Sequence, residues 1–184
     1  MNTELSWKTR LFSSTWNIYR KGWEVGFIKM PLPFLARKGV AEIDGKKYEF
    51  HEKQYFKITA NTEITDVEAD RVVGKIKFDE DDVKALIKID NDVFEWKYKT
   101  LWKNEFTVHN SEGISISYNG SWSGLSGQIE TNGSDDDVTK ILSGLYIVAV
   151  YVRYAAVTLG IVLAVIVALV LAGVSIMQIL RWIF

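Results

Sequence analysis

Few side chains in this sequence could carry out chemistry, and they lie far apart. The chain has two histidines, His51 and His109, and no cysteine, which excludes thiolate nucleophiles, disulfides and cysteine metal sites. Each histidine lies in an alternating stretch with polar neighbours, which is typical of a surface histidine rather than a general base. No nucleophile elbow, phosphate-binding loop or zinc-ligand spacing is present. We therefore predict a protein that is not an enzyme and needs no cofactor.

Two acidic runs, residues 79–82 and 135–137, carry oxygen ligands that a hard cation would accept. The first run is typical of a solvated loop. The second directly precedes an apolar stretch, where acidic side chains complement the dipole of a helix. We therefore predict no metal site, and a helix that begins near residue 137.

Basic residues recur at turns and strand ends in the first third of the chain. Residues 1–60 carry a net charge of +5, against −8 for residues 61–140, and the overall charge of −1 gives no argument for nucleic acid. A basic residue near an anionic bilayer contributes about 1 kcal/mol of attraction. These side chains either share one face that binds membrane lipid or are ordinary hairpin charges on different sides. The predicted lipid-binding residues are Arg20, Lys21, Arg37, Lys38, Lys46 and Lys47.

Short β-strands must position these side chains. Between Leu5 and Glu130, apolar and polar residues alternate in short stretches separated by turn residues such as Asp44-Gly45 and Asn119-Gly120. This pattern predicts roughly twelve antiparallel strands with one buried face. The twelve predicted strands cover residues 5–12, 15–20, 23–30, 37–43, 47–52, 54–60, 62–68, 72–78, 84–90, 93–99, 104–109 and 113–118, and residues 122–130 are a candidate for one more.

The last 44 residues contain only two charges, Arg153 and Arg181. The uncharged stretch before Arg153 has 12 residues, the length of a buried core helix, whereas the stretch from Tyr154 to Leu180 has 27. As a helix the longer stretch reaches about 40 Å and crosses a hydrocarbon core of about 30 Å with some tilt. We predict a transmembrane helix at residues 154–180 and a short tail at residues 181–184.

The shorter stretch is apolar on all sides, so other parts of the protein must surround it. A closed barrel of about twelve strands is too wide for its own side chains to fill. A helix threaded through the barrel satisfies both requirements. We therefore predict a mainly-β domain at residues 1–153, a closed antiparallel barrel around a central hydrophobic helix at about residues 137–153.

Small residues recur at every fourth position of the second stretch, a spacing that lets transmembrane backbones approach closely. Alanine is common in any spanning helix, so formation of a homo-oligomer stays open. The residues concerned are Ala156, Gly160, Ala164, Ala168 and Ala172.

The N-terminal segment lacks the apolar run of a secretory signal, so we expect a single-pass protein with a C-terminal anchor and a cytoplasmic barrel. An outer-membrane barrel is rejected because lysine and glutamate alternate on the outward face of the strands, where lipid requires apolar residues.

Five short sequence motifs in the strand region are of interest. They are Trp16-Asn17-Ile18-Tyr19, Gly22-Trp23-Glu24-Val25-Gly26, Tyr55-Phe56-Lys57-Ile58, Arg71-Val72-Val73-Gly74-Lys75-Ile76 and Asn104-Glu105-Phe106-Thr107-Val108. These motifs, together with the predicted barrel around a helix, resemble the tubby C-terminal-like superfamily, which includes tubby, the phospholipid scramblases and the plant LURP-one-related proteins. The resemblance implies a twelve-stranded barrel around a hydrophobic helix, association with lipid or membrane surfaces, and no catalytic residues.

We therefore expect a membrane-tethered, non-enzymatic β-barrel module that binds anionic lipid at the membrane surface. The alternative is a lipid translocator of the phospholipid scramblase type, in which the tail forms an oligomeric path.

Overall fold

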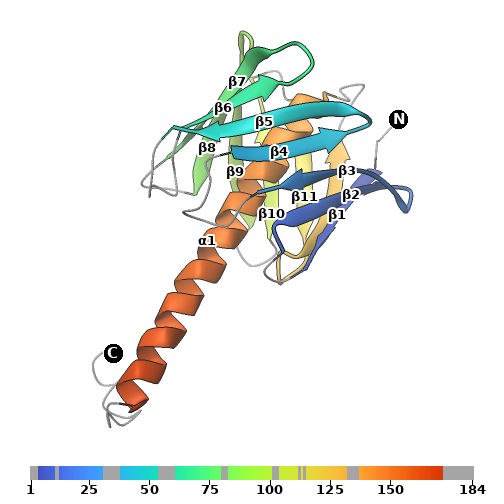
Figure 1. The fold of residues 1–184 in the computed structure, drawn as a ribbon. Coiled ribbons are helices and arrows are strands. Elements are labelled where there is room, and N and C mark those ends of the chain that lie inside the picture. Colours follow the sequence, from blue (N-terminus) through green and yellow to red (C-terminus); the bar gives the residue numbers. More distant parts are fainter. Residues whose placement is uncertain are drawn as a thin grey trace. The chain divides into compact units, whose positions relative to one another are not determined.

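The computed structural model describes residues 4–10, 13–30, 38–53, 61–79, 83–100, 104–111, 113, 115–131 and 137–171. Within these residues the chain forms twelve strands followed by one helix (Figure 1). The strands are β1 (Glu4–Thr9), β2 (Thr15–Arg20), β3 (Trp23–Lys29), β4 (Lys38–Ile43), β5 (Lys46–Glu52), β6 (Thr62–Asp66), β7 (Arg71–Phe78), β8 (Lys84–Ile89), β9 (Asp92–Thr100), β10 (Glu105–His109), β11 (Ser115–Gly120) and β12 (Ser126–Thr131), and the helix is α1 (Val138–Leu171).

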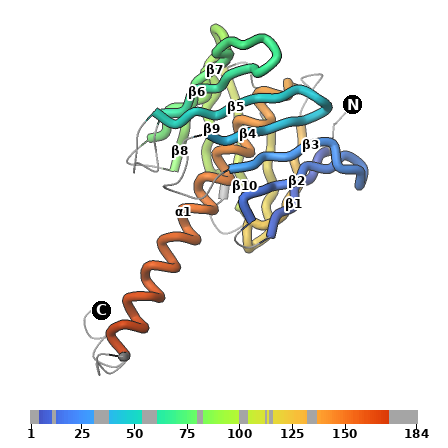
Figure 2. The backbone as a smooth tube through the Cα atoms, viewed as in Figure 1, coloured from blue at the N-terminus to red at the C-terminus, as the bar shows by residue number. Residues whose placement is uncertain are grey.

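The twelve strands form one closed antiparallel barrel, which confirms the predicted fold class. Each strand pairs with its neighbours in sequence, and β1 closes the barrel by pairing with β12 (Figure 2). The strand expected at residues 54–60 lies outside the described residues. The one expected at residues 122–130 begins only at Ser126, because a turn closed by the hydrogen bond from Ser121 N to Ser126 O at 2.7 Å precedes it.

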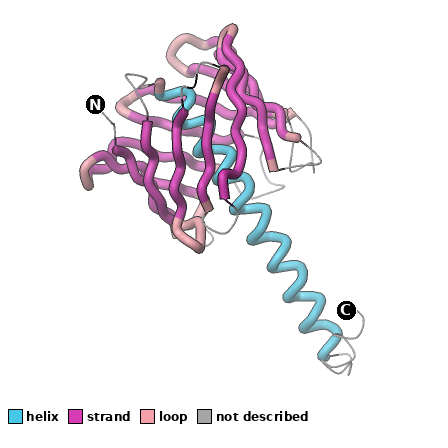
Figure 3. The backbone as a smooth tube through the Cα atoms, turned by 180° about the vertical axis from the view of Figure 1, so that it is seen from behind, coloured by secondary structure: helices cyan, strands magenta, loops and turns pink. Residues whose placement is uncertain are grey.

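Alternating side chains of every strand point into the barrel and fill it, as the sequence pattern predicts. The curved strands around this interior are seen from behind in Figure 3. Trp96 stacks on Phe106 with ring centroids 5.2 Å apart, and both rings are buried. The largest side chains with almost no exposed surface are Trp7, Trp16, Trp96, Tyr118, Tyr146, Phe50 and Phe94.

The barrel has two distinct ends, because neighbouring antiparallel strands alternate in direction around the closed sheet. We call the end where α1 begins the entry end; it holds the connections β2–β3, β4–β5, β6–β7, β8–β9 and β10–β11. The opposite end, which we call the exit end, holds the connections β1–β2, β3–β4, β5–β6, β7–β8, β9–β10 and β11–β12.

The chain divides into two compact units between Val148 and Ala149. The first unit contains the barrel and the first turns of α1, which the strands enclose (Figure 1). The described part of the second unit is the rest of the helix, up to Leu171. The helix is therefore one continuous element through Arg153.

Candidate membrane interface

The helix begins with a polar cap at the entry end of the barrel. Asp137 accepts a hydrogen bond from the backbone N–H of Thr139 at 2.9 Å, the arrangement of an N-cap. Lys140 lies 3.4 Å from the Asp137 carboxylate and 4.7 Å from the centroid of the Phe94 ring. Ser143 donates to the carbonyl of Thr139 at 2.6 Å. The polar side chains of the first turns are thus partnered before the helix enters the apolar interior.

Tyr118 of β11 contacts the helix in the middle of the barrel. Its hydroxyl donates a hydrogen bond to the carbonyl oxygen of Ile141 at 3.0 Å. Burial raises the pKa of Tyr118, so the phenol stays neutral and remains a donor. A Cβ atom at Gly144 would lie 2.2 Å from the same hydroxyl, which explains why a glycine occupies this helix position.

Tyr146 marks the exit end of the barrel. Its ring stacks on Phe50 with centroids 4.3 Å apart, and its hydroxyl donates to Oε1 of Glu52 at 3.1 Å. Glu52 is the last residue of β5, so it lies at the exit end. The helix has therefore crossed the barrel by this point, and Val148, the last residue of the barrel unit, follows two residues later.

The same helix changes its surroundings after the barrel unit ends. From Ile141 to Ala149 every residue is buried, whereas Leu159 and Ile161 are each 61 % exposed. α1 is long and apolar enough to cross a membrane, and none of its most apolar 18-residue window is buried. This confirms one C-terminal apolar helix as a candidate membrane anchor. Residues 172–180 of the predicted span lie outside the described residues.

The small residues predicted to pack between helices lie on this second part of α1. Ala156, Gly160, Ala164 and Ala168 belong to the described helix, and Ala172 lies outside the described residues. A Cβ atom at Gly160 would meet no atom within 4 Å, so its surface is open in the single chain. Self-association through these residues stays a prediction.

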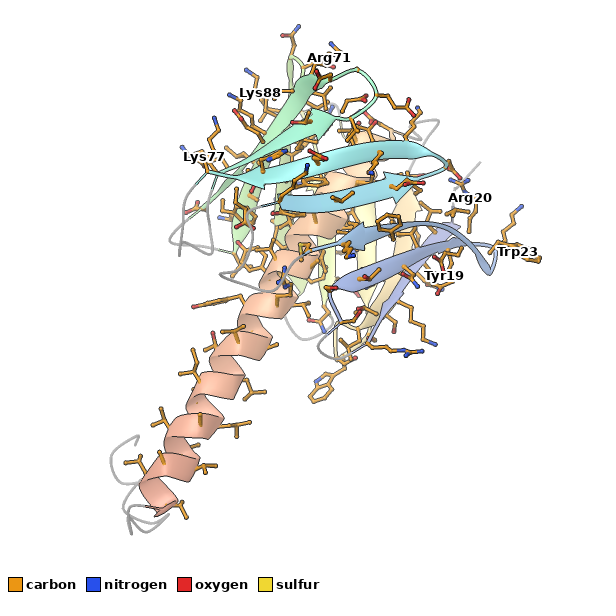
Figure 4. All side chains as sticks on the ribbon, viewed as in Figure 1. Tyr19, Arg20, Trp23, Arg71, Lys77 and Lys88 are labelled. Atoms are coloured by element: carbon orange, nitrogen blue, oxygen red, sulfur yellow. The ribbon has the colours of Figure 1, made fainter. Side chains whose placement is uncertain are left out.

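Four of the predicted lipid-binding residues lie together at the entry end. Arg20 and Lys21 lie at the β2–β3 hairpin, and Lys46 and Lys47 begin β5. Arg20 joins the two hairpins by an ion pair with Asp44 at 2.8 Å. The Arg20 side chain and the exposed Trp23 are labelled in Figure 4.

The remaining two lie elsewhere or outside the described residues. Lys38 is the first residue of β4, at the exit end, and forms an ion pair with Glu49 at 2.6 Å. Arg37 lies outside the described residues. The described members of the predicted set are thus divided between the two ends of the barrel, and their binding of lipid stays a prediction.

The sequence reading overlooked a separation of charge along the barrel axis. Among the described residues, basic side chains predominate near the exit end and acidic ones near the entry end. The exit-end charges are Lys8, Arg10, Lys29, Lys38, Lys53, Lys77, Lys84 and Lys99 against Glu52, Glu63, Asp79 and Glu105. The entry-end charges are Arg20, Lys21, Lys46, Lys47, Arg71, Lys88 and Lys140 against Glu24, Glu42, Asp44, Asp66, Glu68, Asp70, Asp90, Asp92, Glu130 and Asp137.

Two glutamates on the outer surface form ion pairs with lysines of the exit end. The hydrogen bond from Lys38 lowers the pKa of Glu49 below its ordinary value, with a further contribution from His51. Lys53 likewise lowers the pKa of Glu63, and Lys75, whose Nζ lies 3.3 Å from Oε1 of Glu63, adds to this effect. Both carboxyl groups are therefore ionised at neutral pH.

The two histidines lie on the outer face of the barrel. His51 is 3.1 Å from Glu49 and His109 is 3.0 Å from Glu95, and both rings are partly exposed. No group of three metal-ligating side chains occurs among the residues that the structure describes.

No protein-family model, no curated protein and no solved structure matches this chain. The resemblance to the tubby C-terminal-like superfamily therefore stays a prediction.

Proposed function

We propose that the chain is a membrane-tethered, non-enzymatic barrel module that binds anionic lipid at the membrane surface. The observation that carries the tether is the change within one helix from buried side chains at Ile141–Ala149 to exposed apolar ones such as Leu159. Apolar surface in water is unfavourable by about 25 cal/mol for each Å² that burial would remove. A lipid bilayer removes this penalty for a helix that is apolar all round.

A binding role is favoured over catalysis by the way the barrel is filled. Buried aromatic rings and the first turns of α1 occupy the interior, so ligands meet the outer surface and the two ends. The histidines on that surface are each paired with a glutamate and belong to strands on different parts of the barrel. The exposed lysines supply the attraction to anionic lipid.

The superfamily resemblance gives the proposal further support. It implies a barrel around a hydrophobic helix together with membrane association, and it rests on the strand motifs together with the helix-filled barrel. We propose membership of the tubby C-terminal-like superfamily on this basis.

The tether is tested by placing charge in the exposed part of α1. In Leu163→Lys/Val167→Lys each lysine opposes insertion by about 2.5–3.5 kcal/mol near the centre of a span. We expect the native chain to float with vesicles after an alkaline wash and this variant to be released. Leu86→Lys, on the outer face of β8, is the matched control and should stay bound. Release of the native chain by the wash would show that the tether is wrong.

A further inference from the structure

The exit end presents a tryptophan on a turn with a fixed backbone. Trp122, between β11 and β12, is 92 % exposed. The side-chain amide of Asn104 donates to the carbonyls of Ser121 at 2.7 Å and of Trp122 at 2.9 Å. The backbone N–H of Gly124 also donates to Ser121 O at 2.8 Å, which closes the turn. The backbone that carries the indole is thus fixed by hydrogen bonds, and the indole itself is exposed.

Exposed lysines of the same end are available to a partner. Lys29, Lys77 and Lys99 are exposed and form no ion pair with any other residue that the structure describes. Lys77 extends outward from the barrel in Figure 4. Because acidic residues predominate at the opposite end, the part of the barrel that the structure describes has a positive end and a negative end. An anionic surface therefore attracts the exit end first.

The candidate span is attached at this same end. Tyr146 contacts Glu52 at the exit end, Val148 is the last residue of the barrel unit, and Ala149 follows it directly in the chain. Whatever direction residues 149–171 take, they start from the exit end. Tryptophan and basic side chains are the residue types favoured at the headgroup level of a bilayer.

We infer that the exit end of the barrel is a membrane-docking surface, in which Trp122 and the lysines Lys29, Lys77 and Lys99 contact the headgroup region of an anionic bilayer. This inference rests on the proposed tether. It adds which surface of the barrel contacts the bilayer and that the lipid there is anionic. The entry end then faces away from the bilayer, so this inference replaces the sequence-based prediction that Arg20, Lys21, Lys46 and Lys47 bind lipid.

The absence of cysteine from the chain allows a site-specific test on the full protein. Ser123→Cys places a fluorescent label beside Trp122 and leaves the indole intact, and Ser111→Cys places one on the β10–β11 connection of the entry end. Both serines are exposed, so they form a matched pair. Val162→Cys reports on the span itself. Each labelled chain is reconstituted into vesicles of phosphatidylcholine and phosphatidylserine with a headgroup-attached nitroxide quencher, and Val162→Cys also with an acyl-chain quencher.

We expect the label at residue 123 to be quenched at least threefold more than the label at residue 111. Pure phosphatidylcholine vesicles should remove most of this difference, because the attraction depends on anionic lipid. The triple variant Lys29→Glu/Lys77→Glu/Lys99→Glu should lower quenching at residue 123 by half or more. The matched entry-end variant Lys21→Glu/Lys46→Glu/Lys88→Glu has the same change in charge and should leave it unchanged. Trp122→Ala should weaken quenching, and Trp23→Ala should not.

The outcomes separate this inference from the tether. Equal quenching at residues 123 and 111, with the label at residue 162 quenched from the acyl chains, would overturn docking and leave the tether standing. No quenching at residue 162 would overturn both. If the two triple variants lowered quenching at residue 123 equally, the effect would depend on the total charge of the barrel. That result would overturn the assignment of the docking surface to the exit end.

Discussion

The hydroxyl of Tyr118 and the carbonyl of Ile141 are joined by a hydrogen bond of 3.0 Å inside the barrel, where both residues are buried. This bond fixes the height of the helix in the barrel at the point where Gly144 passes the same ring. Register between helix and strands is therefore set by a polar contact as well as by apolar packing.

Gly144→Ala should destabilise the barrel. The added Cβ would lie 2.2 Å from the Tyr118 hydroxyl, and overpacking of a filled core typically lowers the free energy of unfolding by about 1–3 kcal/mol. Gly160→Ala is the matched control in the same helix, because no atom lies within 4 Å of its Cβ position. Chemical unfolding in detergent micelles, followed by tryptophan fluorescence, measures both. Equal stability of the two variants would contradict the threaded packing.

Tyr146→Ala should lower the free energy of unfolding by about 3–5 kcal/mol, the usual range for removing a large buried aromatic side chain. The variant loses the stack on Phe50 and the hydrogen bond to Glu52. Tyr154→Ala, on the exposed part of the helix, is the control and should leave the unfolding of the barrel unchanged. A similar loss in both variants would argue against a special role for the exit-end stack.

Acid should weaken the barrel through Glu63. Lys53 and Lys75 lower the pKa of this carboxyl from 4.5, so its stabilising contribution is complete above pH 4.5 and is lost as the pH falls through the folded value. Glu63→Gln should therefore reduce the loss of melting temperature between about pH 7 and about pH 3. Glu68→Gln, in the exposed β6–β7 turn, should not. The effect is small because the ion pairs are partly exposed.

The tether and the translocator predict opposite results in a lipid-scrambling assay. From Ala155 to Leu171 the helix carries Thr158 as its single polar side chain, so one copy offers headgroups no hydrated path. A fluorescent lipid in the inner leaflet of reconstituted vesicles should stay protected from an external quencher, with or without calcium. Rapid loss of protection that Gly160→Leu abolishes would instead support a translocator built from several copies.

The barrel could be predicted from the sequence because two features determine it. One is the alternation of apolar and polar residues within each strand, and the other is the interior volume of a closed sheet of about twelve strands. Phe94 and Trp96 alternate with charged residues, which reveals the buried face of a strand without any knowledge of its neighbours. The need for a helix in the interior follows from the width of a closed sheet of twelve strands. Asp137 was likewise expected at the start of the helix and is its N-cap.

The charge separation could not be predicted from the sequence, because the end at which a residue lies depends on how many strands precede it. The sequence pattern predicts a strand at residues 54–60, but in the structure β5 pairs directly with β6 through Glu52 and Thr62. Counting that stretch as a strand moves Lys77 and Lys99 to the opposite end of the barrel. The strand pairing seen in the structure is needed to show that Lys77 and Lys99 lie at the same end of the barrel as Lys29.

The closure of the sheet has a consequence for how the chain folds. Glu4 in the first strand pairs with Glu130 in the last, and the helix that fills the interior comes later still in the sequence. Until these late segments are made, an unfinished sheet exposes two open edges and a concave apolar face to water. Contacts between such distant residues form slowly. We therefore expect that the growing chain depends on chaperone protection until residue 148 has left the ribosome, and that ribosome-bound chains ending before α1 are sensitive to protease.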